Sequence, residues 1–133
     1  MIKSYLGYSL RDPNQEEILW FRENPSITGY ASDDGCIVTN PFTTLNNDEI
    51  ESVCINEALR LFMRDQKIKP RIRLTKKQIN FFKGTAYEGN LIEIRQTIIA
   101  RIISGDPSAQ DITPNQRMAA TKIYKLAVEN ASK

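Results

Sequence analysis

The fold is decided by residues 46–65, which read NNDEIESVCINEALRLFMRD. Asn46 is a good N-cap, and Glu49 three residues later completes a capping box, in which each side chain accepts a hydrogen bond from the other residue's backbone N–H. A step of about 100° per residue gathers apolar side chains on one side of a helix. They are Ile50, Val53, Cys54, Ala58, Leu61 and Phe62. We therefore predict a long central helix over about 47–65, on which the rest of the chain packs.

Glu57 falls in the middle of this apolar arc. An ionised carboxylate among apolar side chains is costly unless it is paired or hydrogen-bonded, so two explanations stay open. The structural one is an ion pair with Arg60 or Arg64, or hydrogen bonds from the neighbouring hairpin or the backbone of residues 40–41. The functional one is a polar pocket built from Asn56, Glu57 and Arg60, with Arg64 on its edge, that receives a peptide terminus or a neighbouring subunit.

The same capping pattern, a short polar residue followed three positions later by Gln or Glu, opens four further segments. The caps are Asp12, Thr75, Asn90 and Thr113. The predicted helices span about 12–24, 75–82, 90–104 and 113–130. Trp20 is expected in the core, because aromatic side chains dominate burial in small domains. In the helix over 90–104 we expect Glu93 and Arg101 to face outward.

The remaining segments predict only a small β part. Residues 27–31 and 36–39 flank Ser32-Asp33-Asp34-Gly35, where Asp-Gly supplies the positive φ of a tight turn, so we expect a short hairpin. Residues 40–45 then connect it to the central helix. Residues 1–11 are an edge strand or an extended arm, and residues 130–133 a frayed tail. The predicted fold is mainly α: one compact five-helix domain over 1–133 with one small β-hairpin (α+β).

Composition excludes several classes of function. The 133 residues carry 18 basic and 16 acidic side chains, a net charge of +2, so no strong field attracts nucleic acid or an anionic membrane. The chain has no histidine, which removes Ser-His-Asp triads and histidine-based zinc sites. No glycine-rich phosphate loop occurs. We therefore expect no enzyme activity, no metal, no cofactor and no small-molecule substrate.

The cysteines and the N-terminus bear on localisation. Cys36 and Cys54 make a poor disulfide framework, and Cys54 lies on the apolar face, which suits a reducing cytoplasm. The N-terminal residues lack the pattern of a signal peptide, and no run of about 18 apolar residues occurs. We expect a protein of a reducing cytoplasm that is not exported by a standard signal and has no membrane partner.

Residues 56–60, Asn-Glu-Ala-Leu-Arg, resemble the His-Glu-x-x-His helix of zincin-type metallopeptidases, which also follows a strand and a loop. In that motif two histidines one turn apart bind zinc and the glutamate polarises the metal-bound water. Here Asn56 and Arg60 occupy the ligand positions, and only Glu57 matches. Neither substitute is a useful zinc ligand, so peptidase chemistry is excluded.

A dense basic run follows the central helix, and two phenylalanines come soon after it. It comprises Lys67, Lys69, Arg71, Arg73, Lys76 and Lys77. Such a run can form a strip that contacts phosphates, or simply a solvated face near a helix start. The balanced total charge and the absence of a recognised nucleic-acid motif favour the solvated face.

Three groups of residues carry a resemblance over most of the chain. They are residues 24–34, which contain Asn24-Pro25 and Gly29-Tyr30-Ala31-Ser32-Asp33-Asp34; Asn40-Pro41-Phe42 together with residues 56–64; and residues 98–109. This pattern resembles small, largely uncharacterised proteins of tailed bacteriophages and prophages. The resemblance implies a setting in the virion or its assembly, associated with the head, connector or tail.

We therefore expect a non-enzymatic phage structural or assembly protein that contacts other virion proteins or itself. The first alternative is an intracellular regulator that binds a host or phage protein through Asn56, Glu57 and Arg60. The second is a weak nucleic-acid binder that uses the basic run over 67–77.

Overall fold

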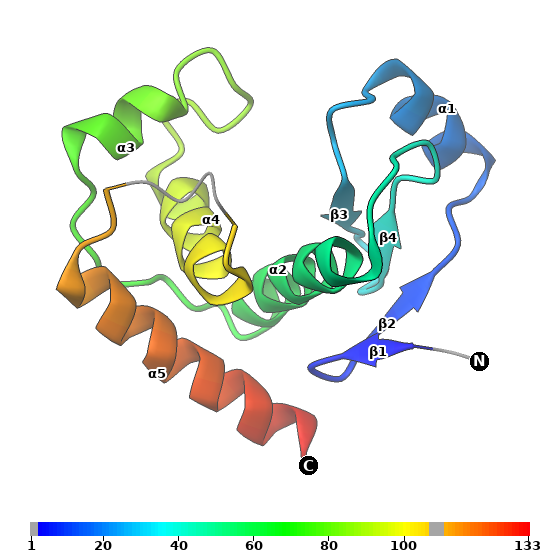
Figure 1. Ribbon diagram of the computed structural model, residues 1–133. Coiled ribbons are helices and arrows are strands. Elements are labelled where there is room, and N and C mark those ends of the chain that lie inside the picture. The colour runs from blue at the N-terminus through cyan, green and yellow to red at the C-terminus, as the bar shows by residue number, and fades with distance from the viewer. Residues whose placement is uncertain (1–2, 107–110) are drawn as a thin grey trace.

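The computed structural model describes residues 3–106 and 111–133, and its centre is the long helix α2 (Asn47–Asp65). Figure 1 shows α2 running between a sheet on one side and the other large helices on the opposite side. Asn46 and Glu49 form the predicted capping box, with the Glu49 backbone N–H donating to the Asn46 side chain at 2.9 Å. The prediction of a central helix over 47–65 is confirmed.

Two hydrophobic clusters meet on α2, which explains its central place. Cys54, Ala58 and Leu61 pack with Ile37 against the sheet. Leu59 and Met63 belong to a second cluster, formed with the later helices. The helix is therefore buried on two sides rather than along the single apolar face that the sequence predicts, because Leu59 and Met63 extend the buried surface beyond that face.

The sheet has four strands in the order β1-β2-β4-β3. β1 (Ser4–Tyr5) and β2 (Tyr8–Arg11) pair antiparallel, and so do β3 (Gly29–Ala31) and β4 (Ile37–Thr39). β2 and β4 pair in parallel, Leu10 beside Ile37 and Arg11 beside Val38. The predicted hairpin is confirmed, with Gly35 at φ 82° in its turn. The β part is larger than the single predicted hairpin, because residues 4–5 and 8–11 form strands of the same sheet, which agrees with the edge-strand alternative for this stretch and not with the extended arm.

Helix α1 (Gln15–Glu23) connects β2 to β3, and its cap corrects a second prediction. The N-cap is Asn14 rather than Asp12, and its capping-box partner is Glu17. Phe21 is fully buried, while its neighbour Trp20 remains 40% exposed. The prediction of a core tryptophan is therefore wrong, because Phe21 occupies the inward position at this turn of the helix.

Three helices cover the other side of α2: α3 (Lys76–Phe81), α4 (Leu91–Ser104) and α5 (Pro114–Ala131). In the described residues the five predicted helices are thus all present. Gly105, in the left-handed conformation, ends α4, and α5 continues two residues into the stretch 130–133 that we expected to fray. None of these helices has the combination of length and apolar character that crossing a bilayer requires.

A buried amide pair joins α3 to α5. Gln78 and Gln116 each complete the capping box of their own helix, and each donates from Nε2 to the other's Oε1 at 2.8 Å. Gln116 Nε2 also donates to the carbonyl of Arg73 at 2.8 Å. Both glutamines are almost completely buried, so this pair holds α3, α5 and the connector before α3 together.

Candidate functional site

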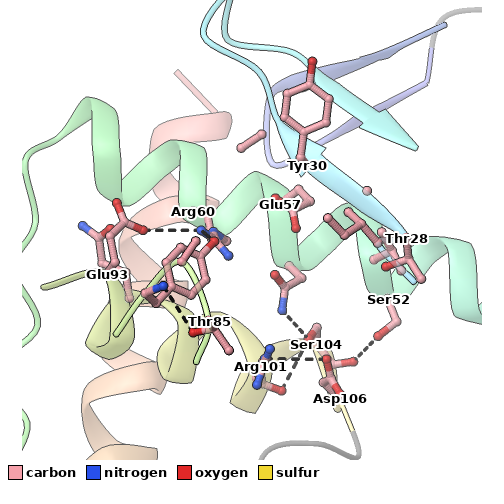
Figure 2. Close-up of a pocket in the computed structure, with 18 of the residues that line it drawn as sticks. Thr28, Tyr30, Ser52, Glu57, Arg60, Thr85, Glu93, Arg101, Ser104 and Asp106 are labelled. Carbon is pink, nitrogen blue, oxygen red and sulfur yellow. Dashed lines mark hydrogen bonds and ion pairs between the residues drawn. The ribbon is translucent and has the colours of Figure 1, made fainter. Parts of the chain in front are cut away.

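A cavity of about 620 Å³ opens between the sheet and the later helices. Its walls are residues 26–31, one face of α2, the loop at residues 85–87 and the inner face of α4 down to Asp106. Figure 2 shows side chains from these separate elements converging on one space. The two sides of the molecule, joined through α2, therefore form the walls of an open cavity that combines charged and apolar side chains.

The face of α2 that lines this cavity carries Val53, Asn56, Glu57, Arg60 and Arg64. These residues recur every three or four positions, so they form one stripe along the helix. Glu57 thus belongs to a polar stripe rather than to the middle of an apolar arc, which corrects the sequence-based placement. The four predicted pocket residues do lie on a common face.

Glu57 is the residue of this stripe that has no partner. It is only 8% exposed, and burial raises the pKa of its carboxyl to about 7, although the nearby charges of Arg60 and Arg101 act to lower that pKa. Within residues 3–106 and 111–133, no group forms a hydrogen bond or an ion pair with Glu57. In Figure 2 the side chain extends from α2 into the cavity, and no dashed line reaches it.

Arg60 does not neutralise Glu57, because its guanidinium is held elsewhere. It donates to the hydroxyl of Tyr87, pairs with Glu93 at 3.4 Å and lies 5.1 Å from the centre of the Tyr87 ring. Glu93 lines the cavity through this contact, while its side chain remains 38% exposed, as the outward prediction requires. The structural explanation of Glu57 through an ion pair with Arg60 is not realised in this arrangement.

Arg101 is the second buried cation beside Glu57, and the prediction that it faces outward is wrong. Its guanidinium carbon lies 5.5 Å and 5.3 Å from the ring centres of Phe81 and Phe82, and its Nε lies 3.9 Å from Asp106. Such cation–aromatic contacts hold a guanidinium in a partly dry environment. Nothing in the local sequence indicates this role, because the contacts come from α3 and from the residue after Gly105.

Small polar groups fix the end of the cavity where α2 meets the C-terminus of α4. Ser52 Oγ donates to the carbonyl of Ser104 at 2.5 Å, and Asn56 Nδ2 donates to Ser104 Oγ at 3.3 Å. The side-chain amide of Asn56 is therefore held in the cavity wall by its hydrogen bond to Ser104. These bonds keep the two helices in register around Glu57.

Arg64, the fourth predicted residue, serves the hairpin. Its guanidinium donates to the backbone carbonyl of Ser32 at 2.7 Å and lies 3.8 Å from the carboxylate of Asp33. It ties the β3–β4 turn to α2. Asn40 likewise makes no hydrogen bond to Glu57, because its side chain donates to the carbonyl of Ile27 and accepts from the backbone N–H of Phe42. The predicted hydrogen bonds from the hairpin or from residues 40–41 to Glu57 are therefore absent among the described residues.

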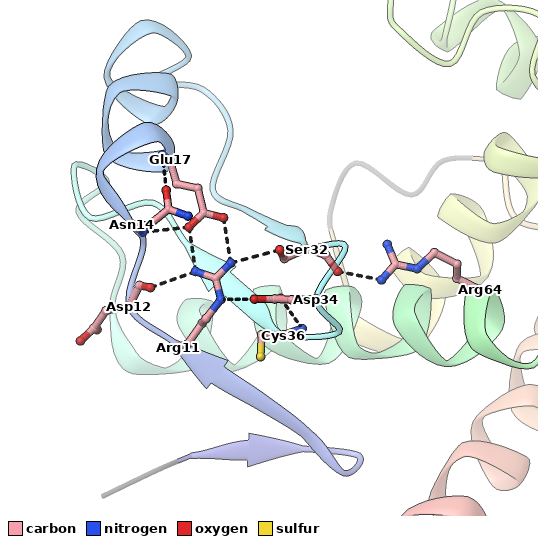
Figure 3. Close-up of polar contacts among 8 residues, drawn as sticks. All are labelled: Arg11, Asp12, Asn14, Glu17, Ser32, Asp34, Cys36 and Arg64. Carbon is pink, nitrogen blue, oxygen red and sulfur yellow. Dashed lines mark hydrogen bonds and ion pairs between the residues drawn. The ribbon is translucent and has the colours of Figure 1, made fainter.

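A network centred on Arg11, which the sequence does not indicate, holds the far side of the hairpin (Figure 3). Arg11 makes two hydrogen bonds to Glu17, at 2.7 Å and 3.0 Å, and one to Asp34 at 2.8 Å. It also donates to Ser32 Oγ at 3.1 Å. Its hydrogen bonds and charge hold the pKa of the Glu17 carboxyl below its usual range, although burial acts in the opposite direction. Arg11 thus joins β2, α1 and the hairpin that forms one cavity wall.

The predicted basic strip over 67–77 is divided by the fold. Lys69, Arg71 and Arg73 line a second groove together with Lys122 of α5. Lys67 precedes this groove, and Lys76 and Lys77 are exposed in the first turn of α3, outside it. Three of the six residues therefore line this groove, and the other three lie outside it.

Cys36 and Cys54 are both free. In the described part of the chain no group of three or more acidic or cysteine side chains could hold a metal ion. Comparison with protein-family models, with curated proteins and with solved structures finds no match to the chain. The distinctive chemical feature of the site is the carboxylate of Glu57, which is nearly buried, has no protein partner among the described residues and lines an open cavity.

Proposed function

We propose that the protein is a non-enzymatic binding component of phage assembly or of the virion, and that a segment of a partner protein enters the cavity beside Glu57. The binding step is supported by one observation, the buried carboxylate of Glu57 without a partner. The side chain is nearly buried, but its carboxylate oxygens keep some accessible surface in the cavity, so a cationic or hydrogen-bonding group that enters the cavity can pair with them. The phage setting is supported by the sequence resemblance.

The charge balance of the cavity indicates the chemistry of the arriving group. Arg60 is balanced by Glu93, and Arg101 lies beside Asp106. Arg64 is engaged with Asp33. Ionised Glu57 is then the charge left over, and a lysine, an arginine or a terminal amine would neutralise it while donating hydrogen bonds. The partner segment is therefore basic at the position that enters the cavity.

Counting this chain against the major capsid protein in purified particles, by quantitative mass spectrometry, tests the proposal. We expect a reproducible copy number for the wild-type chain and at least a tenfold loss for Glu57→Gln, which keeps the shape of the side chain but removes its charge. Glu23→Gln is the matched control, because Glu23 is exposed on α1 and the same charge is removed. It should leave the copy number unchanged.

Absence of the wild-type chain from particles would refute the virion part of the proposal. If the chain then copurifies in a fixed ratio with a soluble host or phage protein, and Glu57→Gln abolishes that complex, the intracellular regulator is correct instead. If the complex or the particle retains Glu57→Gln to the same extent as Glu23→Gln, the proposed role of the cavity is refuted.

A further inference from the structure

A second groove, of about 630 Å³, lies between helix α5 and the connector that joins α2 to α3. One side is the connector over residues 68–75, and the other is the first half of α5. Figure 1 shows this connector passing the start of α5 on its way from α2 to α3. None of its lining residues is shared with the Glu57 cavity, so it is an independent site.

The base of this groove is apolar. Ile72 and Ile123 are buried there, and Ile68, Leu74 and Ala119 are partly buried against the same cluster. The side chain of Met118 lines the groove at the surface and is 60% exposed. Exposed apolar surface of this kind, beside polar residues, is typical of a binding groove.

The rim of the groove is basic. Lys69, Arg71, Arg73 and Lys122 all line it and are exposed, and no aspartate or glutamate does. In the described residues none of these four side chains takes part in an ion pair. The groove therefore carries four uncompensated positive charges around an apolar base, although the whole chain has a net charge of only +2.

The connector is held through its backbone carbonyls, by side chains of both α4 and α5. The carbonyls of Ile68 and Ile72 accept from Gln96 and Arg95 of α4 at 2.9 Å each, and that of Arg73 accepts from Gln116. The backbone N–H groups of Lys69 and of residues 71–74 find no acceptor among the described residues. Because successive N–H groups of an extended segment point to opposite sides, alternate ones of this set are available to pair with one added peptide strand, and the segment is already ordered.

We infer that this groove binds an extended peptide segment in which acidic residues alternate with aliphatic ones. Aliphatic side chains fit the apolar base, carboxylates meet the four cations at the rim, and peptide carbonyls accept from the free N–H groups. A single-stranded nucleic acid fits less well, because no aromatic side chain lines the groove on which a base could stack.

The test uses the purified chain and a library of ten-residue peptides with Asp or Glu at odd positions and Leu, Ile or Val at even positions. Affinity selection on the immobilised chain is followed by fluorescence anisotropy of the retained peptides. A library with Lys in place of the acids, and a random 20-nucleotide single strand, are measured in parallel. Arg71→Ala/Lys122→Ala tests the groove, and Lys76→Ala/Lys77→Ala is its matched control, because both remove two exposed charges.

We expect the acidic peptides to bind in preference to both other probes. The groove double variant should bind about tenfold more weakly, while the control double variant and Glu57→Gln should change the affinity less than about twofold. The inference is overturned if no acidic peptide is retained, if the oligonucleotide binds more tightly than every peptide, or if both double variants lose affinity equally. Because Glu57→Gln is expected to leave this peptide affinity unchanged, a negative result for the groove is independent of the role proposed for the Glu57 cavity.

Discussion

Replacing Glu57 by glutamine should stabilise the protein at neutral and alkaline pH. The pKa of Glu57 is raised from 4.5 to about 7 by burial. Each unit of difference between the folded and unfolded pKa corresponds to about 1.4 kcal/mol, so the ionised side chain costs the folded state about 3 kcal/mol. Glutamine fills the same space without carrying a charge, and most of this cost should disappear.

The pH dependence gives the sign of the effect. Below about pH 4.5 the carboxyl is neutral in the folded and the unfolded chain, and Glu57 carries no charge penalty. As the pH rises from 4.5 towards 7 the unfolded chain loses its proton first, so the free energy of unfolding falls. Above about pH 7 both states are ionised, and the full penalty remains. The advantage of Glu57→Gln should therefore grow through this window and then level off.

Urea unfolding followed by far-UV circular dichroism, at several pH values from about 4.5 to 8, measures this difference. Glu23→Gln again serves as the control, and its stability should track the wild type at every pH. A Glu57→Gln advantage that stays constant within about 0.5 kcal/mol across the window would refute the reasoning. So would a variant less stable than the wild type at pH 8, since that result requires an ionised and well-paired carboxylate.

Three further substitutions test the framework around the cavity by urea unfolding. Arg11→Met leaves a nearly buried glutamate without its cation and should cost about 2–4 kcal/mol; a loss below about 0.5 kcal/mol would show that the network is solvated. Gly29→Ala places a Cβ 2.9 Å from the Val53 side chain and 3.0 Å from a backbone oxygen, and should cost about 1–3 kcal/mol, whereas an unchanged stability would exclude this contact. Gln116→Glu replaces a buried hydrogen-bond donor with a carboxyl group. It should lower the free energy of unfolding by about 2–4 kcal/mol at neutral pH, where the carboxyl is ionised, and by less in acid, where it is protonated. A loss of stability that does not change with pH would contradict the burial of the Gln78–Gln116 pair.

Local signals predicted most of the helices correctly. The caps at Asn46, Thr75, Asn90 and Thr113 are where the sequence places them, because a capping residue acts within its own first turn. The cap of α1 was misplaced by two residues, since both Asp12 and Asn14 are followed by a suitable partner. Glu17, the capping-box partner of Asn14, also binds Arg11. That second contact is tertiary, so the local sequence does not reveal it.

The sheet and the cavity depend on contacts that are distant in the sequence. The parallel pairing of β2 with β4 joins residue 10 to residue 37, so short strands alone do not reveal it. Asn56, Glu57 and Arg60 could be grouped by helical spacing, as predicted. Tyr87 and Glu93 could not, because they meet Arg60 across 27 and 33 residues of intervening chain. For the same reason the sequence does not indicate that Arg101, predicted to face outward, lies beside Glu57.

The amide pair of Gln78 and Gln116 has a consequence for local unfolding. α3 has six residues and is too short to persist alone, so its capping box survives only while α5 holds Gln78. Gln116 also holds the connector through the carbonyl of Arg73. α3 and the first turn of α5 should then open as one cooperative unit, so that their hydrogen-bonded amides exchange at similar rates, whereas the unpaired amides of the connector exchange fast until a ligand covers them. A peptide bound in the groove beside this unit would slow exchange in all three segments together.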